Sequence, residues 1–142
     1  MGERNCVKYR LEMTEEQART VIAALDLANR IRLGQWGEIV EHCMEWDKET
    51  ETIESWSMRR DDAEALLLQA RDIVMPDLRS MHSLVGGHGV YAREETERAY
   101  NVLLAVRSAI AWHNNPNGDY TVDFRRPMAI HINEEMPRCE VW

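Results

Sequence analysis

The sequence predicts an α+β fold, a small antiparallel sheet packed on one face by three main helices. Residues 7 to 13 and 119 to 124 alternate apolar and polar side chains, which is the pattern of half-buried strands. Residues 14 to 33 carry apolar residues at helical spacing, and residues 102 to 112 are apolar on nearly every side of a predicted helix. With 142 residues, 44% of them hydrophobic, we expect a single domain over residues 1 to 142.

VKYRLEM, residues 7 to 13, is the first predicted strand. Its odd-numbered side chains are apolar and would point one way, while its even-numbered side chains are charged and would point the other. The next four residues, T-E-E-Q, match a capping box in which Thr14 and Gln17 satisfy each other's backbone. Gly34 suits the C-terminal cap of this helix, and a shorter helix then restarts near Trp36.

The middle of the chain predicts one long loop and one helix. Residues 47 to 60 are polar and are expected to form the loop. Asp61 can cap the next helix, whose apolar residues continue to Ile73 and which ends at Pro76. SLVGGHGVY, residues 83 to 91, is interpreted as a connecting loop, because its glycines match neither GxGxxG nor a P-loop.

The third main helix is predicted to begin near Arg93, with three glutamates in its first turn that suit the positive end of the helix dipole. Pro116 prevents the helix from continuing, and Asn117-Gly118 signals a turn. DYTVDF, residues 119 to 124, is the second predicted strand. AIHI, residues 129 to 132, can add a further short strand.

The composition narrows the classes of partner. A formal charge of −8 is unfavourable for binding along DNA or RNA, which needs a basic surface. No apolar run is long enough to cross a membrane, and no secretory signal is visible at the N-terminus. Cys6, Cys43 and Cys139 are scattered and odd in number, which favours a reducing compartment. We expect a cytoplasmic protein whose partners include neither a nucleic acid polymer nor a membrane.

The sequence carries no motif of a familiar reaction. GxSxG, HExxH and Walker motifs are missing from it, and its five histidines share no metal-ligand spacing. Glu38 with Glu41, and Glu51 with Glu54, have the ExxE spacing of magnesium-dependent nucleotide pyrophosphatases, but no ExxD follows. Solvated surface acids explain these pairs better. We therefore expect no catalytic residue, no metal and no cofactor. A nucleotide hydrolase whose motifs are not recognisable is the alternative.

Arginines are the candidates for binding a small anion. Arg107 interrupts an apolar helix, and a buried guanidinium needs a partner. That partner can be an internal carboxylate such as Asp123, an acid across a dimer interface, or a ligand phosphate. Arg125 and Arg126 end the second predicted strand and offer planar donor forks that suit phosphate oxygens, although a polar strand end also explains them.

Four other residues are candidates for the same ligand. Asn114 follows the apolar helix and either caps it or holds a polar edge of a base or ribose. Tyr91 either stacks on an adenine or packs in the interior. Arg30 and Gln35, at the end of the first helix, are weaker candidates.

Three segments resemble a known family in the same order along the chain. YRLEMTEEQARTVIAALDLANRIRLGQWGEI, residues 9 to 39, resembles the N-terminal signature of the phage-encoded Thoeris anti-defence 1 family. ERAYNVLLAVRSAIAWHNNPNG, residues 97 to 118, and VDFRRPM, residues 122 to 128, resemble its C-terminal half. The chain departs from the family pattern at three positions. Ala28 stands where the family pattern has an aromatic residue, Trp36 where it has a phenylalanine, and Gly37 where it has an acid.

The resemblance implies a sponge rather than an enzyme. Such phage proteins act in the cytoplasm of the infected bacterial host. They bind the cyclic ADP-ribose isomer of the Thoeris system, glycocyclic ADP-ribose, and keep it intact, so that the downstream effector is never activated. Members assemble as homodimers and homohexamers with pockets at subunit interfaces, and some also take cyclic oligonucleotides of cGAS-like pathways. The other hypothesis left open is an acidic protein–protein interaction module that inhibits a host factor.

If the chain is such a sponge, residue chemistry and motif position suggest a division of roles. Arg107, Arg125 and Arg126 would hold phosphates, Tyr91 would stack on the base, and Asn114 would hold a polar edge. Arginines pooled from two subunits would allow an acidic protein to build a basic pocket.

Overall fold

The computed structural model describes residues 7–78, 94–125 and 134–142. Within them the order of elements is α1 (Glu15–Arg32), α2 (Glu38–Cys43), α3 (Ile53–Val74), the 3-10 turn η1 (Pro76–Leu78), α4 (Glu94–Asn114) and the 3-10 turn η2 (Val122–Phe124). Over these ranges the chain is helical and contains no strand. The predicted α+β fold with a small antiparallel sheet is therefore wrong.

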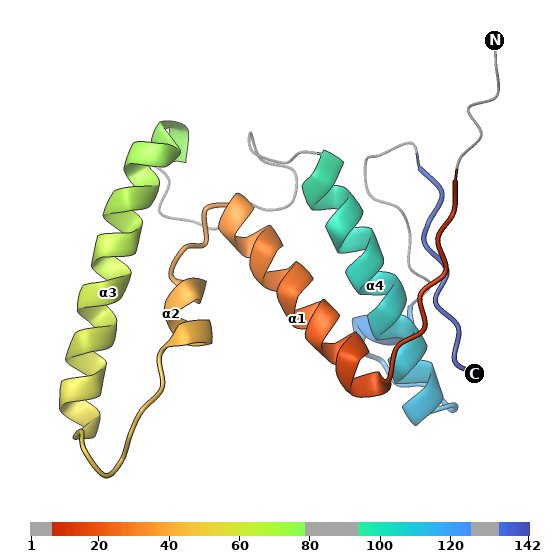
Figure 1. The fold of residues 1–142 in the computed structure, drawn as a ribbon, viewed down its shortest axis with the longest axis horizontal. Helices are drawn as coiled ribbons and strands as arrows, with labels where there is room; N and C mark the ends of the chain where they lie inside the picture. The colour runs from red at the N-terminus through yellow and green to blue at the C-terminus, as the bar shows by residue number, and fades with distance from the viewer. Residues whose placement is uncertain (1–6, 79–93, 126–133) are drawn as a thin grey trace.

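The two predicted strands failed for different reasons. Residues 7 to 13 are extended (Figure 1), but no backbone ladder pairs them with another described segment. In residues 119 to 124, local bonds replace a ladder, because the amide of Phe124 donates to Thr121 O at 3.2 Å and the amide of Arg125 donates to Val122 O at 3.1 Å. These i→i+3 bonds define η2. AIHI, residues 129 to 132, lies outside the described residues.

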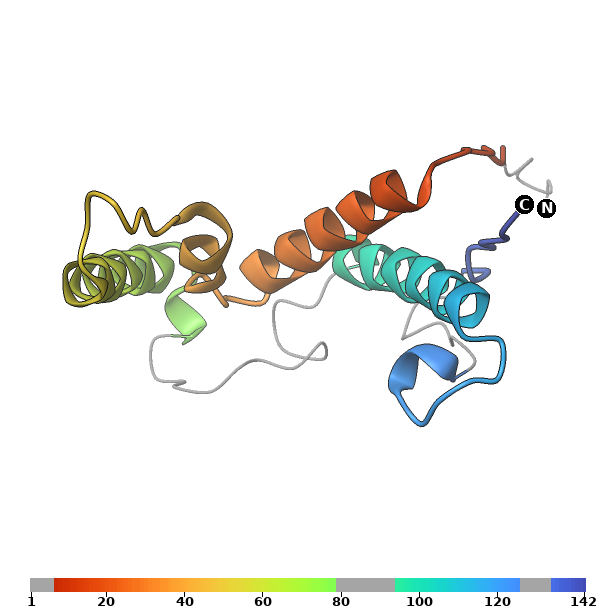
Figure 2. The ribbon, with the colours of Figure 1, turned by 90° about the horizontal axis from the view of Figure 1, so that it is seen from below.

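Helices α1 and α4 form the main packed pair, side by side in both views (Figures 1 and 2). They run in opposite directions, since Asn114 donates to Glu15 at one end at 3.3 Å and Arg32 lies 4.0 Å from Glu95 at the other. Leu103 is the most buried large side chain, at 1% exposed. The predicted helix near 93 to 112 is confirmed, and its apolar residues supply most of this core.

The N-terminal cap of α1 is the one that the sequence predicted. The amide of Gln17 donates to the Thr14 hydroxyl at 3.2 Å, and the Gln17 side chain accepts from the Thr14 amide at 2.9 Å. Gly34 follows the helix end with φ of 85°, a left-handed conformation that glycine adopts without strain. The shorter helix after Trp36 is α2.

Helix α3 begins earlier than predicted: the predicted loop over residues 47 to 60 extends only to residue 52, and the predicted cap at Asp61 is wrong. The N-cap is Thr52, whose hydroxyl accepts from the Ser55 amide at 3.2 Å. α3 lies against α2, on the far side of α2 from the α1–α4 pair (Figure 1), and none of its residues is buried. Because α3 lacks a buried face, its sequence carries no apolar periodicity that could have revealed its start.

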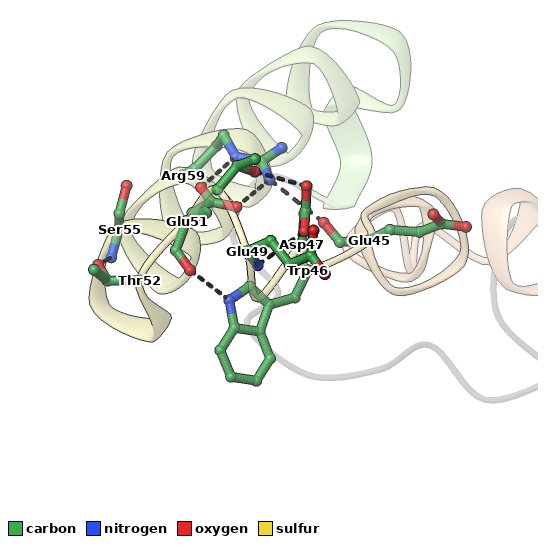
Figure 3. Close-up of polar contacts among 9 residues, drawn as sticks. Glu45, Trp46, Asp47, Glu49, Glu51, Thr52, Ser55 and Arg59 are labelled. Carbon is green, nitrogen blue, oxygen red and sulfur yellow. Dashed lines mark hydrogen bonds and ion pairs between the residues drawn. The ribbon is translucent and has the colours of Figure 1, made fainter.

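The acidic segment before α3 is an ordered turn, drawn in Figure 3. The Asp47 carboxylate accepts from the Glu49 amide at 3.0 Å and from the Thr50 hydroxyl at 2.7 Å. Trp46 Nε1 donates to Glu51 O at 3.1 Å, and Arg59 from α3 lies 2.8 Å from the Glu51 carboxylate. These bonds offset part of the repulsion among the acids and fix the start of α3.

The extended segments at the two ends of the chain run side by side next to α4 (Figure 1). Lys8 lies 2.8 Å from Glu135, and the Arg10 guanidinium lies 4.9 Å from the ring centre of Trp142. Arg98 of α4 donates to the Glu134 carboxylate at 2.8 Å. None of the helices in the described ranges combines the length and apolar character that a membrane span requires.

Candidate functional site

A hollow of about 520 Å³ lies between α1 and α4. One part of its wall is apolar and the rest is charged or polar. The apolar lining is Ile22, Ala23, Leu103, Ile110 and Ala111, and the polar lining is Arg19, Asp26, Arg30, His42, Arg107, Asn114 and Asp123. Most of these residues come from the facing sides of the two long helices, while His42 comes from α2 and Asp123 from η2.

Arg107 is paired inside the chain. Its Nη2 lies 2.8 Å from Asp123 Oδ1, so the internal carboxylate expected as one possible partner is present. The same oxygen accepts no hydrogen bond, which means that the guanidinium N–H groups do not point at it. The contact is therefore an ion pair without hydrogen-bond geometry. Both side chains are partly exposed, 38% for Arg107 and 28% for Asp123.

The turn after α4 brings Asp123 back to Arg107. Asn115 Nδ2 donates to Gly118 O at 3.1 Å, and Gly118 adopts φ of 77°. Phe124 of η2 then packs edge-to-face on Trp112, with ring centres 5.1 Å apart. The segment predicted as a strand thus folds back onto α4 as a 3-10 turn, which places Asp123 in the lining of the hollow.

Arg30 links α1 to α2. Its Nε donates to Asp26 at 2.7 Å, and its Nη1 donates to Gln35 at 3.3 Å and to Glu38 at 3.2 Å. The hydrogen bond to Asp26 raises the pKa of the Arg30 guanidinium, with Glu38 adding a smaller effect. Gln35 orients Arg30 and is not itself part of the lining.

Arg19 is a lining residue that sequence reasoning missed. Its guanidinium donates to the Glu15 carboxylate, one turn earlier, at 2.5 Å, and Asn114 Nδ2 donates to the same carboxylate at 3.3 Å. These bonds, first from Arg19 and then from Asn114, lower the pKa of Glu15. The only sign of this contact in the sequence is the i,i+4 spacing of Glu15 and Arg19, and such pairs are common on solvated helix faces.

The predicted ligand residues divide into three groups. Arg30, Arg107 and Asn114 all line the hollow. Gln35 contacts Arg30 without lining the hollow, and Arg125 is exposed directly after η2 and also lies outside the lining. Arg126 and Tyr91 lie outside the described residues.

The charges around the hollow nearly cancel. Three lining arginines stand against two lining aspartates, which leaves a net charge of +1 with His42 neutral. The two glutamates that pair with Arg19 and Arg30 bring the total to −1. Each guanidinium therefore already has a carboxylate partner, and an anionic ligand must compete with it.

No cluster of three or more metal-ligating side chains occurs in the described part of the chain. No family model, no curated protein and no solved structure matches this chain.

Proposed function

We propose that this protein is a phage anti-defence protein that binds and sequesters, without cleaving it, a cyclic ADP-ribose-type signal such as glycocyclic ADP-ribose. The observation that carries the proposal is the α1–α4 hollow, where Arg30, Arg107 and Asn114 meet an apolar wall. Its volume of about 520 Å³ lies within the range of small-molecule sites. The resemblance of the helix and turn segments to the Thoeris anti-defence 1 family supports the same proposal.

The weakness of the Arg107–Asp123 ion pair supports phosphate binding at Arg107. Arg107 and Asp123 are partly exposed and lack hydrogen-bond geometry, so their pairing contributes little free energy. A pyrophosphate carries more charge than a carboxylate and accepts two parallel bonds from one guanidinium. The ligand phosphate takes the place of the Asp123 carboxylate and draws on Arg107 N–H groups that now donate to no hydrogen bond with Asp123.

The remaining wall suits the nucleoside part of the ligand. The apolar side of the hollow, which includes Ile22 and Ile110, offers a surface for a base. Asn114 supplies an amide for a polar edge, at the cost of its bond to Glu15. Arg125, exposed two residues after Asp123, is available for the same ligand.

Sequestration requires affinity and no bond cleavage. A nanomolar Kd corresponds to about −12 kcal/mol, which charge-assisted bonds and a buried base can supply together. Association of copies as a homodimer or homohexamer, in the host cytoplasm, would bring arginines from neighbouring subunits into one pocket, which would make that pocket basic although each chain has a net charge of −8. Cyclic oligonucleotides of cGAS-like pathways share this phosphate chemistry and are further candidate ligands.

One experiment tests the proposal. The protein is incubated with glycocyclic ADP-ribose, passed through a desalting column, heated, and its supernatant analysed by mass spectrometry. We expect intact signal to be released only after heating. Degraded signal would indicate a hydrolase instead. Signal that never travels with the protein would remove the proposal. The same assay is run on Arg107→Ala, which should not retain the signal. Its matched control is Arg138→Ala, a change to an 82% exposed arginine on the C-terminal segment.

A second candidate function rests on α3. This helix buries none of its residues, and its exposed apolar side chains include Leu66, Ile73 and Val74, which are 65%, 82% and 64% exposed. An exposed apolar stripe of this kind is typical of a protein interaction surface. An interaction module that blocks a host factor would leave the signal free in the same experiment.

A further inference from the structure

Residues 7 to 13 form an extended segment whose apolar side chains face solvent. Val7, Tyr9 and Leu11 are 71%, 92% and 75% exposed. No backbone N–H or C=O of this segment bonds to another backbone group in the parts of the chain that the structure describes. An exposed extended segment with apolar side chains and an unpaired backbone is a template for pairing with a second extended segment.

The segment is already held in an extended form by its charged side. Lys8 pairs with Glu135 at 2.8 Å, and Arg10 stacks on Trp142 at 4.9 Å. Residues alternate between two sides of an extended chain, so these contacts lie away from Tyr9 and Leu11. The apolar side stays uncovered while the backbone is pre-ordered, which reduces the entropy cost of pairing.

We propose that a second copy of this chain covers the segment, with the two copies of residues 7 to 13 pairing as antiparallel strands about Leu11. This register places residue 10 of one copy opposite residue 12 of the other. Arg10 then faces Glu12 twice, once in each direction, and Tyr9 faces Met13. Opposite charges directly across a strand pair are favourable, and so are apolar pairs.

The charge pattern selects this register over its neighbours. Pairing about Arg10 would place two arginines directly opposite each other. A shift by one residue would turn apolar side chains onto the charged side. Pairing about Leu11 avoids both penalties, so the segment complements itself. This inference does not depend on the nucleotide site.

The predicted interface is small compared with the roughly 1,200 Å² or more buried in standard interfaces. We therefore expect a concentration-dependent dimer, detectable by light scattering on the full chain over a wide range of concentrations. Arg10→Glu places acid opposite acid twice, and Glu12→Arg places arginine opposite arginine twice. Each variant alone should weaken dimerisation by about tenfold or more.

Mixing the two variants provides the decisive measurement. A copy with Arg10→Glu and a copy with Glu12→Arg restore two opposite-charge pairs, so the mixture should dimerise as the natural chain does. Recovery in the mixture also shows that neither variant is misfolded. If the natural chain is monomeric at all concentrations, or if either single variant dimerises normally, the proposal is overturned.

Cross-linking tests the register directly. In a chain with Cys6, Cys43 and Cys139 replaced by serine, Leu11→Cys lies on the two-fold axis and should form an intermolecular disulfide. Tyr120→Cys, at a 99% exposed position, is the matched control and should not. A monomer whose residues 7 to 13 are protected from hydrogen exchange would show that another segment of the same chain covers them, which also overturns the proposal.

Discussion

The Arg107 guanidinium lies 2.8 Å from the Asp123 carboxylate, and both side chains line the hollow between α1 and α4. This pair connects the middle of a long helix to a short 3-10 turn sixteen residues later. Because both side chains are partly exposed, the pair contributes at most about 1 kcal/mol to folding. Because breaking this ion pair costs little free energy, a ligand phosphate can replace Asp123 as the partner of Arg107.

Replacing Arg107 should separate binding from stability. We expect Arg107→Ala to abolish binding of glycocyclic ADP-ribose, measured by calorimetry, and to lower the free energy of unfolding by about 1 kcal/mol or less. The reason is that the lost ion pair is partly solvated, whereas the lost phosphate contact is charge-assisted. Arg138→Ala should change neither quantity. Unchanged affinity in Arg107→Ala would remove this residue from the site.

Replacing Asp123 should have the opposite effect on affinity. Asp123→Asn keeps the size of the side chain and removes the charge that competes with a phosphate for Arg107. We expect tighter binding of the same ligand by calorimetry. Asp62→Asn, at an exposed position on α3, is the matched control. Weaker binding in Asp123→Asn would mean that the carboxylate orients Arg107 for the ligand rather than competing with it.

Local signals in the sequence predicted the parts of the fold that depend on neighbours along the chain. The capping box at Thr14, the glycine at Gly34 and the apolar run before Trp112 all mark helices that the structure contains. Apolar and charged side chains do alternate over residues 7 to 13, but this pattern indicates only which side chains share a face of an extended segment. Whether a strand forms depends on a distant backbone partner, which no local pattern specifies.

The same limit applies to the candidate site. Arg107 was recognisable because one charge interrupts an apolar helix. Arg19 and Asp26 were missed, since polar residues at helical spacing are usual on any solvated face. They line the hollow only because α4 packs against that side of α1, and this contact joins residues far apart in the sequence.

Replacement by alanine should lower stability more at Gly118 than at Gly37. Gly118 adopts φ of 77°, and an added Cβ would lie 3.1 Å from the Trp112 ring, so Gly118→Ala should cost about 1–2 kcal/mol in urea unfolding. At Gly37 the backbone is helical and an added Cβ would meet only the flexible end of Glu64, so Gly37→Ala should change stability by less than about 1 kcal/mol. Equal losses would show that the turn does not require a left-handed residue.

The C-terminal segment should detach in acid. Arg98 lowers the pKa of Glu134, and Lys8 lowers the pKa of Glu135, both from an ordinary value of 4.5. A carboxyl whose pKa is lower in the folded state stabilises the fold above its unfolded pKa, and this contribution is lost as the pH falls through the lowered value. We therefore expect the melting temperature to fall below about pH 4.5, and less steeply at high salt, because these exposed ion pairs are screened.

Glu134→Gln removes one of these carboxylates without changing the length of the side chain. The variant should melt at a lower temperature than the natural chain at pH 7, and its melting temperature should depend less on pH between 5 and 3. Glu140→Gln, on the same exposed segment, is the matched control. If both variants keep the full pH dependence, the bond between Arg98 and Glu134 does not hold the C-terminal segment against α4.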